Sequence, residues 1–383
     1  GRTLNMEMKF RKLWPLVGAL CATAFSSAFA NSNYSSNGSM DSSSSSQAAQ
    51  NTYQRGTFRE ITPIAGPRVA HGADVFMTAN FIWWKAAQDG LDYSVSGVSL
   101  GSDTSVTGTG SVSDPGFSWD PGFKVGLGLN MSHDGWDLFA QYTWLHSNHN
   151  NTSKGGQGLL NFVSAFNNSP SGENVSRSAS WDFHFNVIDL ELGRNFYLSQ
   201  FLMTRLFTGL KFTWQDQDFK ATERAGEGGS FNFGGNPAEG PFVTRQNLDT
   251  WGMGIRSGLQ NAFHFSTEWS IYANLAFSGM WTSIDSKRKD DLSGITPNPA
   301  GYNADKFTSI DTKKSCYRIR YVGELELGLR WETWFYDDNY HFAIDAGYEQ
   351  QVWINNGAFI RFGSDDQGDL SLNGLNLKFR FDF

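Results

Sequence analysis

Two histidines with neighbouring aspartates are the residues of this chain best suited to catalysis. His146 and His149 lie three positions apart, and Asp134 and Asp137 precede them. A His–Asp pair provides the base and its orienting carboxylate in many hydrolases. No serine elbow and no spacing typical of metal ligands accompanies these residues. We therefore expect solvated loop histidines, no enzymatic activity, no cofactor and no metal site.

Ionised side chains that alternate with large apolar ones form a second candidate group. Leu325 and Leu327 share one parity of their segment, whereas Glu324 and Glu326 share the other. Successive side chains of a strand point to opposite faces, so such a segment has one apolar and one charged face. Charges on a common interior face either select solutes in a wet lumen or form ion pairs that fill a narrow one. The predicted lumen-lining residues are Arg205, Lys211, Arg256, Arg318, Arg320, Glu324, Glu326, Arg330, Lys378 and Arg380. Further inward-facing candidates are Lys124, Asp137, Asp189, Glu191, Asp345 and Glu349.

The segments that carry these charges have the pattern of transmembrane strands. Leu375–Phe383 alternates strictly between apolar and polar residues, and we interpret Phe383 as a C-terminal assembly signal. About ten such segments follow Asp74, and short connections alternate with long ones rich in Gly, Ser and Asn. A soluble β-sandwich also alternates, but it has no reason to sort its loops by length. The pattern predicts an all-β, antiparallel transmembrane β-barrel of about ten strands, with short periplasmic turns and long outer loops. Twelve or more strands are expected only if Asp92–Val112 and Asn161–Val175 contain further hairpins.

One predicted strand changes phase along its length. Its apolar residues occupy odd positions up to Phe185 and even positions from Ile188 onward. A one-residue slip turns every later side chain to the other face, so we expect a β-bulge near Val187. In another strand, the glycines from Gly252 to Gly258 fall on the predicted inner face, where they are expected to leave space for a lumen.

Aromatic residues gather near the ends of the predicted strands. Tryptophan and tyrosine are enriched at the two membrane–water interfaces, where one part of the ring is wet and the rest is apolar. Barrels and sandwiches of other kinds are also aromatic-rich, but here the pairs fall about one membrane crossing apart. The predicted girdle residues are Trp83, Trp84, Trp136, Trp144, Trp269, Trp281, Trp331, Tyr340 and Tyr348.

The first part of the chain differs in composition from the rest. Basic residues precede the apolar stretch Leu13–Ala24, and Ala28–Ala30 has the form of a cleavage site, so residues 1–30 are expected to be a signal peptide with some upstream residues. Residues 31–73 are rich in Ser and Asn and predict a flexible periplasmic leader, followed by the barrel over 74–383. The net charge of −8 excludes nucleic acid as a partner. Cys316 would be the only cysteine left, and the sequence does not say whether it cross-links chains.

Several motifs together resemble those of the Legionella-type major outer membrane protein family. They are Trp83–Leu91, His133–Phe139, Asp189–Arg194, Leu325–Glu332 and Tyr348–Trp353, and the similarity extends from residue 74 to the end. The family also occurs in environmental chlamydiae, and its members are pore-forming outer-membrane proteins without catalytic residues. The resemblance therefore implies a porin-like role. The cysteine-rich, cross-linked proteins of pathogenic chlamydiae differ, since a single cysteine cannot build such a lattice.

These patterns predict a porin that allows passive diffusion of small hydrophilic solutes and ions across the outer membrane of a Gram-negative-type bacterium. The expected partners are the lipid bilayer, the solutes and the outer-membrane assembly machinery. The sequence does not decide whether the chain forms a homo-oligomer. The alternative is a barrel with a filled lumen whose long outer loops act in adhesion or surface interaction, because ten strands lie near the filled end of the barrel size range. Solute identity and ion selectivity do not follow from the sequence.

Overall fold

The structure, a computed structural model, describes most of the chain after residue 72. The described residues are 73–96, 99–100, 106–107, 109–131, 135–154, 176–225, 231–233, 236–239, 241–291, 296–297, 309–336, 339–360 and 368–383. The predicted signal peptide and nearly all of the predicted leader lie outside these residues. No helix in the described part is long and apolar enough to cross a membrane.

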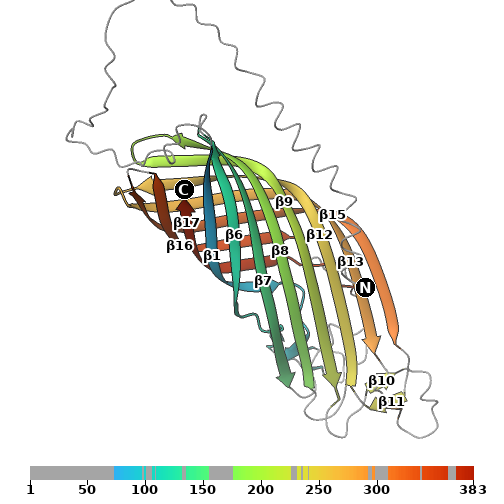
Figure 1. Ribbon diagram of the computed structural model, residues 1–383. Coiled ribbons are helices and arrows are strands. Elements are labelled where there is room, and N and C mark those ends of the chain that lie inside the picture. The colour runs from blue at the N-terminus through green and yellow to red at the C-terminus, as the bar shows by residue number, and fades with distance from the viewer. Residues whose placement is uncertain are drawn as a thin grey trace, which may run out of the picture. The chain divides into compact units, whose positions relative to one another are not determined.

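Ten antiparallel strands close into one barrel (Figure 1). The barrel strands are β1 (Ala73–Gln88), β6 (Trp119–Met131), β7 (Trp136–Lys154), β8 (Ser176–Tyr197), β9 (Leu202–Arg224), β12 (Pro241–His264), β13 (Trp269–Asp291), β15 (Ile310–Phe335), β16 (Tyr340–Ile354) and β17 (Leu370–Asp382). Each strand pairs with the next barrel strand in the chain, and β1 pairs with β17 to complete the circle. The predicted fold class and the expected number of strands are confirmed.

The remaining strands are short and lie between barrel strands. They are β2 (Ser94–Ser96), β3 (Ser99–Leu100), β4 (Val106–Thr107), β5 (Ser111–Ser113), β10 (Phe231–Phe233), β11 (Asn236–Glu239) and β14 (Thr296–Pro297). They form separate small sheets outside the barrel circle. The segment Asp92–Val112 therefore contains strands but adds none to the barrel, and Asn161–Val175 lies outside the described residues.

The outer face of every barrel strand carries an apolar stretch. Large side chains such as Phe81, Ile255, Phe277 and Leu327 point outward and are exposed. A water-soluble protein would bury a band of this size, so its natural solvent is lipid. Eight of the nine predicted girdle residues lie on this outer parity, but Trp84 is 0% exposed and points inward, so its assignment was wrong. Its neighbour Trp83 takes the outer position and packs against Trp119.

Strand β8 runs without interruption through the position of the expected bulge. Buried and partly exposed residues alternate without a slip from Ser176 to Gly193, and pairing with β7 and β9 is continuous across Val187. The bulge prediction was wrong because it assumed that apolar side chains always face lipid. Phe185 and the aromatic residues before it point into the barrel instead.

The strands are of unequal length, which divides the barrel into two sides. Six consecutive strands, β7, β8, β9, β12, β13 and β15, have 19 to 26 residues. The other four, β16, β17, β1 and β6, have 13 to 16 residues. Figure 1 shows the six long strands extending past the four short ones at the end that carries the long connections. We call this projecting part the tall wall, and the two ends of the barrel the short-turn end and the long-loop end.

Candidate functional site in the barrel interior

The interior next to the short-turn end is filled with ionised side chains. We call this set the charged layer; its members are Lys124, Asp137, Asp189, Glu191, Arg205, Lys211, Arg256, Glu324, Glu326 and Glu349. They come from seven of the ten barrel strands and all lie on the inward parity of their strand. Ionised groups are rarely buried unless they are paired, so their partners determine what this layer can do.

Lys211 and Arg256 are at the centre of the charged layer. The Lys211 Nζ lies 2.9 Å from Asp189 Oδ1 and 2.9 Å from Glu324 Oε1. The Arg256 guanidinium is 2.7 Å from the second oxygen of Glu324 and also pairs with Glu191. Arg256 Nε also lies 3.8 Å from Asp189 Oδ1, so Lys211 pairs with two carboxylates and Arg256 with three, and Asp189 and Glu324 are shared between both cations.

Other ion pairs extend the layer towards the remaining strands. Arg205 Nη1 lies 2.8 Å from Glu191 Oε2, and its other donors bind Asp137 at 2.5–3.1 Å. Lys124 of β6 reaches Glu349 of β16 at 2.6 Å, although β1 and β17 lie between these strands. Contacts between strands this far apart cross the lumen rather than follow its wall.

A smaller cluster at the short-turn end contains two histidines. The His341 Nδ1 lies 2.7 Å from Asp382, and its Nε2 lies 3.2 Å from Glu332. The other oxygen of Glu332 is 3.0 Å from His264 Nε2, and Arg380 binds Asp382 at 2.6 Å. The cluster links the ends of four strands, β12, β15, β16 and β17, and so fixes the base of the barrel.

The interior towards the long-loop end has the opposite chemistry. We call this set the apolar layer; its main members are Ile82, Trp84, Trp181, Phe183, Phe185, Phe219, Leu248, Met280, Trp353 and Phe359. All of them are buried, and the aromatic rings stack in sequence along β8 from Trp181 to Phe185. Cys316, a free cysteine, is partly buried against this layer.

One ring contact in the apolar layer spans the whole width of the barrel. Phe185 of β8 and Trp353 of β16 meet edge to face, with ring centroids 5.4 Å apart. Four strands separate β8 from β16 in either direction around the circle. The two rings therefore come from opposite walls, and their contact crosses the lumen directly above the charged layer, because Lys211 Nζ lies 5.6 Å from the Trp353 ring centroid.

A segment after β16 folds into the mouth above this contact. Arg320 donates to the side-chain oxygen of Asn356 at 3.0 Å and to its carbonyl at 2.6 Å. Arg288 donates to the Ile360 carbonyl at 2.8 Å, and Phe359 packs on Phe219. Two cations of the wall thus hold this segment, and the segment completes the apolar layer.

The structure places all ten predicted lining residues on the inward parity, but not in one group. Arg205, Lys211, Arg256, Glu324 and Glu326 lie in the charged layer; Arg330, Lys378 and Arg380 lie closer to the short-turn end; Arg318 and Arg320 lie on the long-loop side. Arg330 binds Asp345 at 2.7 Å. Whether any of them lines an open passage stays a prediction.

Sequence reasoning missed the apolar layer entirely. The signal was present in β8, where the phase of the apolar residues changes after Phe185. We interpreted this change as a β-bulge in the backbone, whereas it marks the point where the barrel interior changes from apolar to charged. The expected space beside the glycines of β12 is also occupied: a Cβ at Gly258 would lie 2.7 Å from the ring of Phe207.

The histidines considered for catalysis do not share a site. His146 is on the outward parity of β7 and His149 on the inward parity, where its Nε2 lies 2.7 Å from Asp120. Asp137 is near the other end of β7, bound to Arg205. Asp134 lies outside the described residues. The proposed His–Asp pairing with Asp134 or Asp137 is therefore not formed by the described residues.

A closed antiparallel barrel with an apolar outer band, aromatic girdles and a charged interior defines a transmembrane β-barrel protein. The chain belongs to the family described as Legionella pneumophila major outer membrane protein precursor, whose model matches residues 67–383. It is therefore an outer-membrane protein and associates with the lipid bilayer. The resemblance noted in the sequence is confirmed.

Solved structures with a similar arrangement are distant in sequence. The outer membrane protease OmpT from Escherichia coli is 8% identical, with 81% of this chain and 96% of that chain covered and a TM-score of 0.36. Ail, the attachment invasion locus protein of Yersinia pestis, is 10% identical, with 81% and 99% covered and a TM-score of 0.20. The Pseudomonas putida toluene transporter TodX is 7% identical, with 82% and 90% covered and a TM-score of 0.19. No curated protein sequence matches the chain.

Proposed function

We propose that this protein is a pore for small hydrophilic solutes and ions whose passage is shut in the conformation described. The charged layer is the conducting part, and the apolar layer above it is the gate. The observation that carries the proposal is the separation of the interior into these two layers, joined at the contact between Phe185 and Trp353.

The energetics of buried ion pairs support a conducting role for the charged layer. Removal of two ions from water costs several kcal/mol per ion, and well-packed apolar residues of the same volume are often as stabilising. A barrel that only had to be filled would gain little from so many cations and carboxylates. A lumen that admits water and ions at intervals needs such groups, because they replace part of the hydration shell of a solute.

The gate supports a passage that opens at intervals rather than one that stays open. The apolar layer is completed by a segment outside the strands, residues 355–360, which Arg288 and Arg320 hold in the mouth. Release of this segment would expose apolar surface and let water reach the charged layer. Export through a cleaved signal peptide, insertion by the outer-membrane assembly machinery and residence in a Gram-negative-type outer membrane belong to the same proposal.

A second candidate is favoured by the same ring contact. If the Phe185–Trp353 contact never opens, the barrel is sealed, and its surface beyond the membrane is what remains available for function. The tall wall and the long outer loops would then act in adhesion or interaction with another surface.

Single-channel recording in planar bilayers distinguishes the two candidates. We expect rare openings from the wild type and at least about tenfold more open time from the double variant Phe185→Ala/Trp353→Ala. Phe277→Ala, which removes an aromatic ring of comparable size from the outer face of β13, should behave as the wild type. Silence of the folded wild type and of the folded double variant at every voltage would overturn the pore and leave the sealed barrel.

A further inference from the structure

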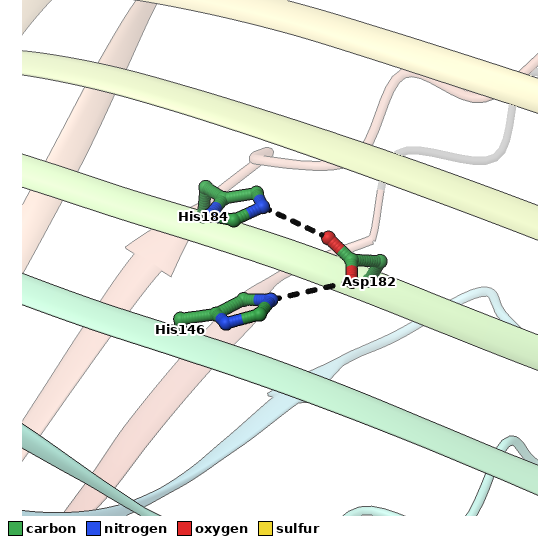
Figure 2. Close-up of side chains that lie close together, drawn as sticks. All are labelled: His146, Asp182 and His184. Atoms are coloured by element: carbon green, nitrogen blue, oxygen red, sulfur yellow. Dashed lines mark hydrogen bonds and ion pairs between the residues drawn. The ribbon is translucent and has the colours of Figure 1, made fainter.

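Three side chains on the outside of the barrel converge on one point, on the opposite face of the wall from the apolar layer. His146 comes from β7, and Asp182 and His184 come from β8. His146 and His184 are directly opposite in the pairing of the two strands, and Asp182 is two residues further along β8 on the same face. Figure 2 shows the carboxylate of Asp182 next to both imidazole rings, with one nitrogen of each ring directed towards it.

The donor atoms of this cluster lie close to the separations that a metal ion requires. Asp182 Oδ2 lies 3.2 Å from His146 Nε2, and Asp182 Oδ1 lies 3.1 Å from His184 Nε2. The two rings are stacked, with centroids 4.1 Å apart and planes inclined by 5°. The candidate ligand atoms all lie within 4.8 Å of one another. Tetrahedral ligands at about 2.0–2.1 Å from Zn²⁺ are separated by about 3.3 Å, so only small side-chain rotations are needed.

The surroundings of the cluster favour a cation. Asn148 donates to Asp182 Oδ2 at 2.6 Å and so orients the carboxylate, as outer-shell partners do in metal sites. Asp216 of β9 is paired with His184 and lies on the same outward parity, which adds negative charge nearby. The ring of Trp144, a girdle residue, is 6.5 Å from that of His146, so the cluster lies just beyond the membrane interface. The side chains are 37%, 28% and 46% exposed for His146, Asp182 and His184, which leaves access for an ion and its water.

The ligand types determine which cations fit. Imidazole nitrogens bind Zn²⁺, Ni²⁺ and Cu²⁺ well, whereas Mg²⁺ and Ca²⁺ prefer oxygen ligands. Three protein ligands leave one position of a tetrahedral ion for water. We propose that His146, Asp182 and His184 form a zinc-type metal site on the outer face of the barrel, just beyond the aromatic girdle. The expectation of no metal site rested on spacing along the chain, and His146 is 36 and 38 residues away from Asp182 and His184, on a different strand.

The test is metal titration of the full chain, refolded in detergent without a polyhistidine tag and stripped with a chelator. Calorimetry with Zn²⁺ should give one ion per chain, and Co²⁺ should develop the visible absorption of a four-coordinate nitrogen–oxygen site. His184→Ala and Asp182→Asn should each weaken Zn²⁺ binding by at least about tenfold, and a hundredfold excess of Mg²⁺ should not compete. His149→Ala is the matched control, because it removes the same residue type from the inner face of the same strand and should change the affinity less than twofold.

The alternative is that Asp182 only accepts hydrogen bonds from the two imidazoles. In that case the wild type would bind no stoichiometric Zn²⁺, or His184→Ala would bind it as tightly as the wild type, and either result overturns the site. The variants change partly exposed side chains, so circular dichroism of each should match the wild type before titration. The outcome does not depend on whether the lumen conducts.

Discussion

The charged layer and the apolar layer fill the same barrel and use the same inward parity of the same strands, yet they differ in how specific their contacts are. In the charged layer Arg205, Lys211 and Arg256 are each placed by at least two carboxylates, as Lys211 is by Asp189 and Glu324. In the apolar layer the rings meet at several angles, and the polar contacts of Trp181 and Trp353 are single hydrogen bonds to Gln217 and Gln351 rather than pairs of ionic contacts. The parity of a residue on its strand decides whether its side chain points inward or outward, but the polarity of the surroundings decides which residue type is stable there. The charged layer should therefore tolerate replacement poorly and the apolar layer well.

Lys211→Met provides the largest expected effect. The substitution keeps most of the side-chain volume but removes the cation that lies between Asp189 and Glu324, so that Arg256 alone remains near both carboxylates. We expect a loss of about 3–5 kcal/mol in the free energy of unfolding, the range for a buried pair that loses one partner. Urea unfolding in lipid vesicles, followed by tryptophan fluorescence, measures it. The double variant Lys211→Met/Glu324→Gln should recover part of the loss, and a cost below about 1 kcal/mol for Lys211→Met would show that the pairing is not what holds this layer.

Leu327→Arg tests whether the wall separates two media. Leu327 follows Glu326 directly and points outward, where it is exposed. The introduced guanidinium would face lipid, so the free energy of unfolding should fall by about 2–4 kcal/mol, although arginine is accepted in the barrel interior. The same unfolding assay applies, with Leu327→Met as the control, for which little change is expected. An equal stability of Leu327→Arg and the wild type would mean that the outer face of β15 is not in lipid at this height.

Met280→Leu measures the tolerance of the apolar layer. Met280 is fully buried and belongs to the apolar layer. Swaps between Met and Leu conserve volume and usually cost less than about 1.5 kcal/mol. The unfolding free energy of this variant should thus fall well short of the loss in Lys211→Met. A larger loss at Met280 than at Lys211 would reverse the comparison of the two layers.

Arg245→Ala should have the smallest effect. Arg245 binds Asp291 at 3.5 Å on the outer face of the tall wall, and its side chain is half exposed. Exposed ion pairs of this kind contribute about 0.2–1 kcal/mol and weaken as salt is added. The difference from the wild type should vanish in 1 M NaCl, whereas the loss in Lys211→Met should persist. A salt-independent loss at Arg245 would contradict its assignment as a solvated pair.

The sequence predicted the barrel well because its signal is repeated. Every strand shows an alternation of apolar and polar residues, and short connections alternate with long ones along the chain. The β15 segment from Glu324 to Arg330 is by itself enough to show which face of the strand is polar. The same rule gave the inward position of Lys211 and Arg256 correctly. It did not give their partners, because Lys211 and Glu324 are distant in the chain and meet only after closure.

The errors have one common cause. Trp84 was assigned to the girdle and β8 was given a bulge because apolar character was equated with contact with lipid. Along β8 the alternation of buried and partly exposed residues is unbroken, and it is the interior itself that becomes apolar above Val187. The zinc-type cluster was missed for a related reason: His146 and His184 are opposite each other only because of strand register, which the sequence does not display.

The unequal strand lengths have a consequence for how this protein meets other chains. Within the described residues, β7 pairs on one side only after Leu145, and β15 pairs on one side only before Tyr321. Among the described residues, two stretches at the margins of the tall wall thus lack a second barrel strand beside them, as at the border of an open sheet. Lysines at 313 and 314 stand on one of these borders, and charges of this kind discourage fibrous stacking of neighbouring molecules. The barrel has no sheet edge where all ten strands pair, but the longer strands β7 and β15 form two sheet edges beyond the ends of the short strands.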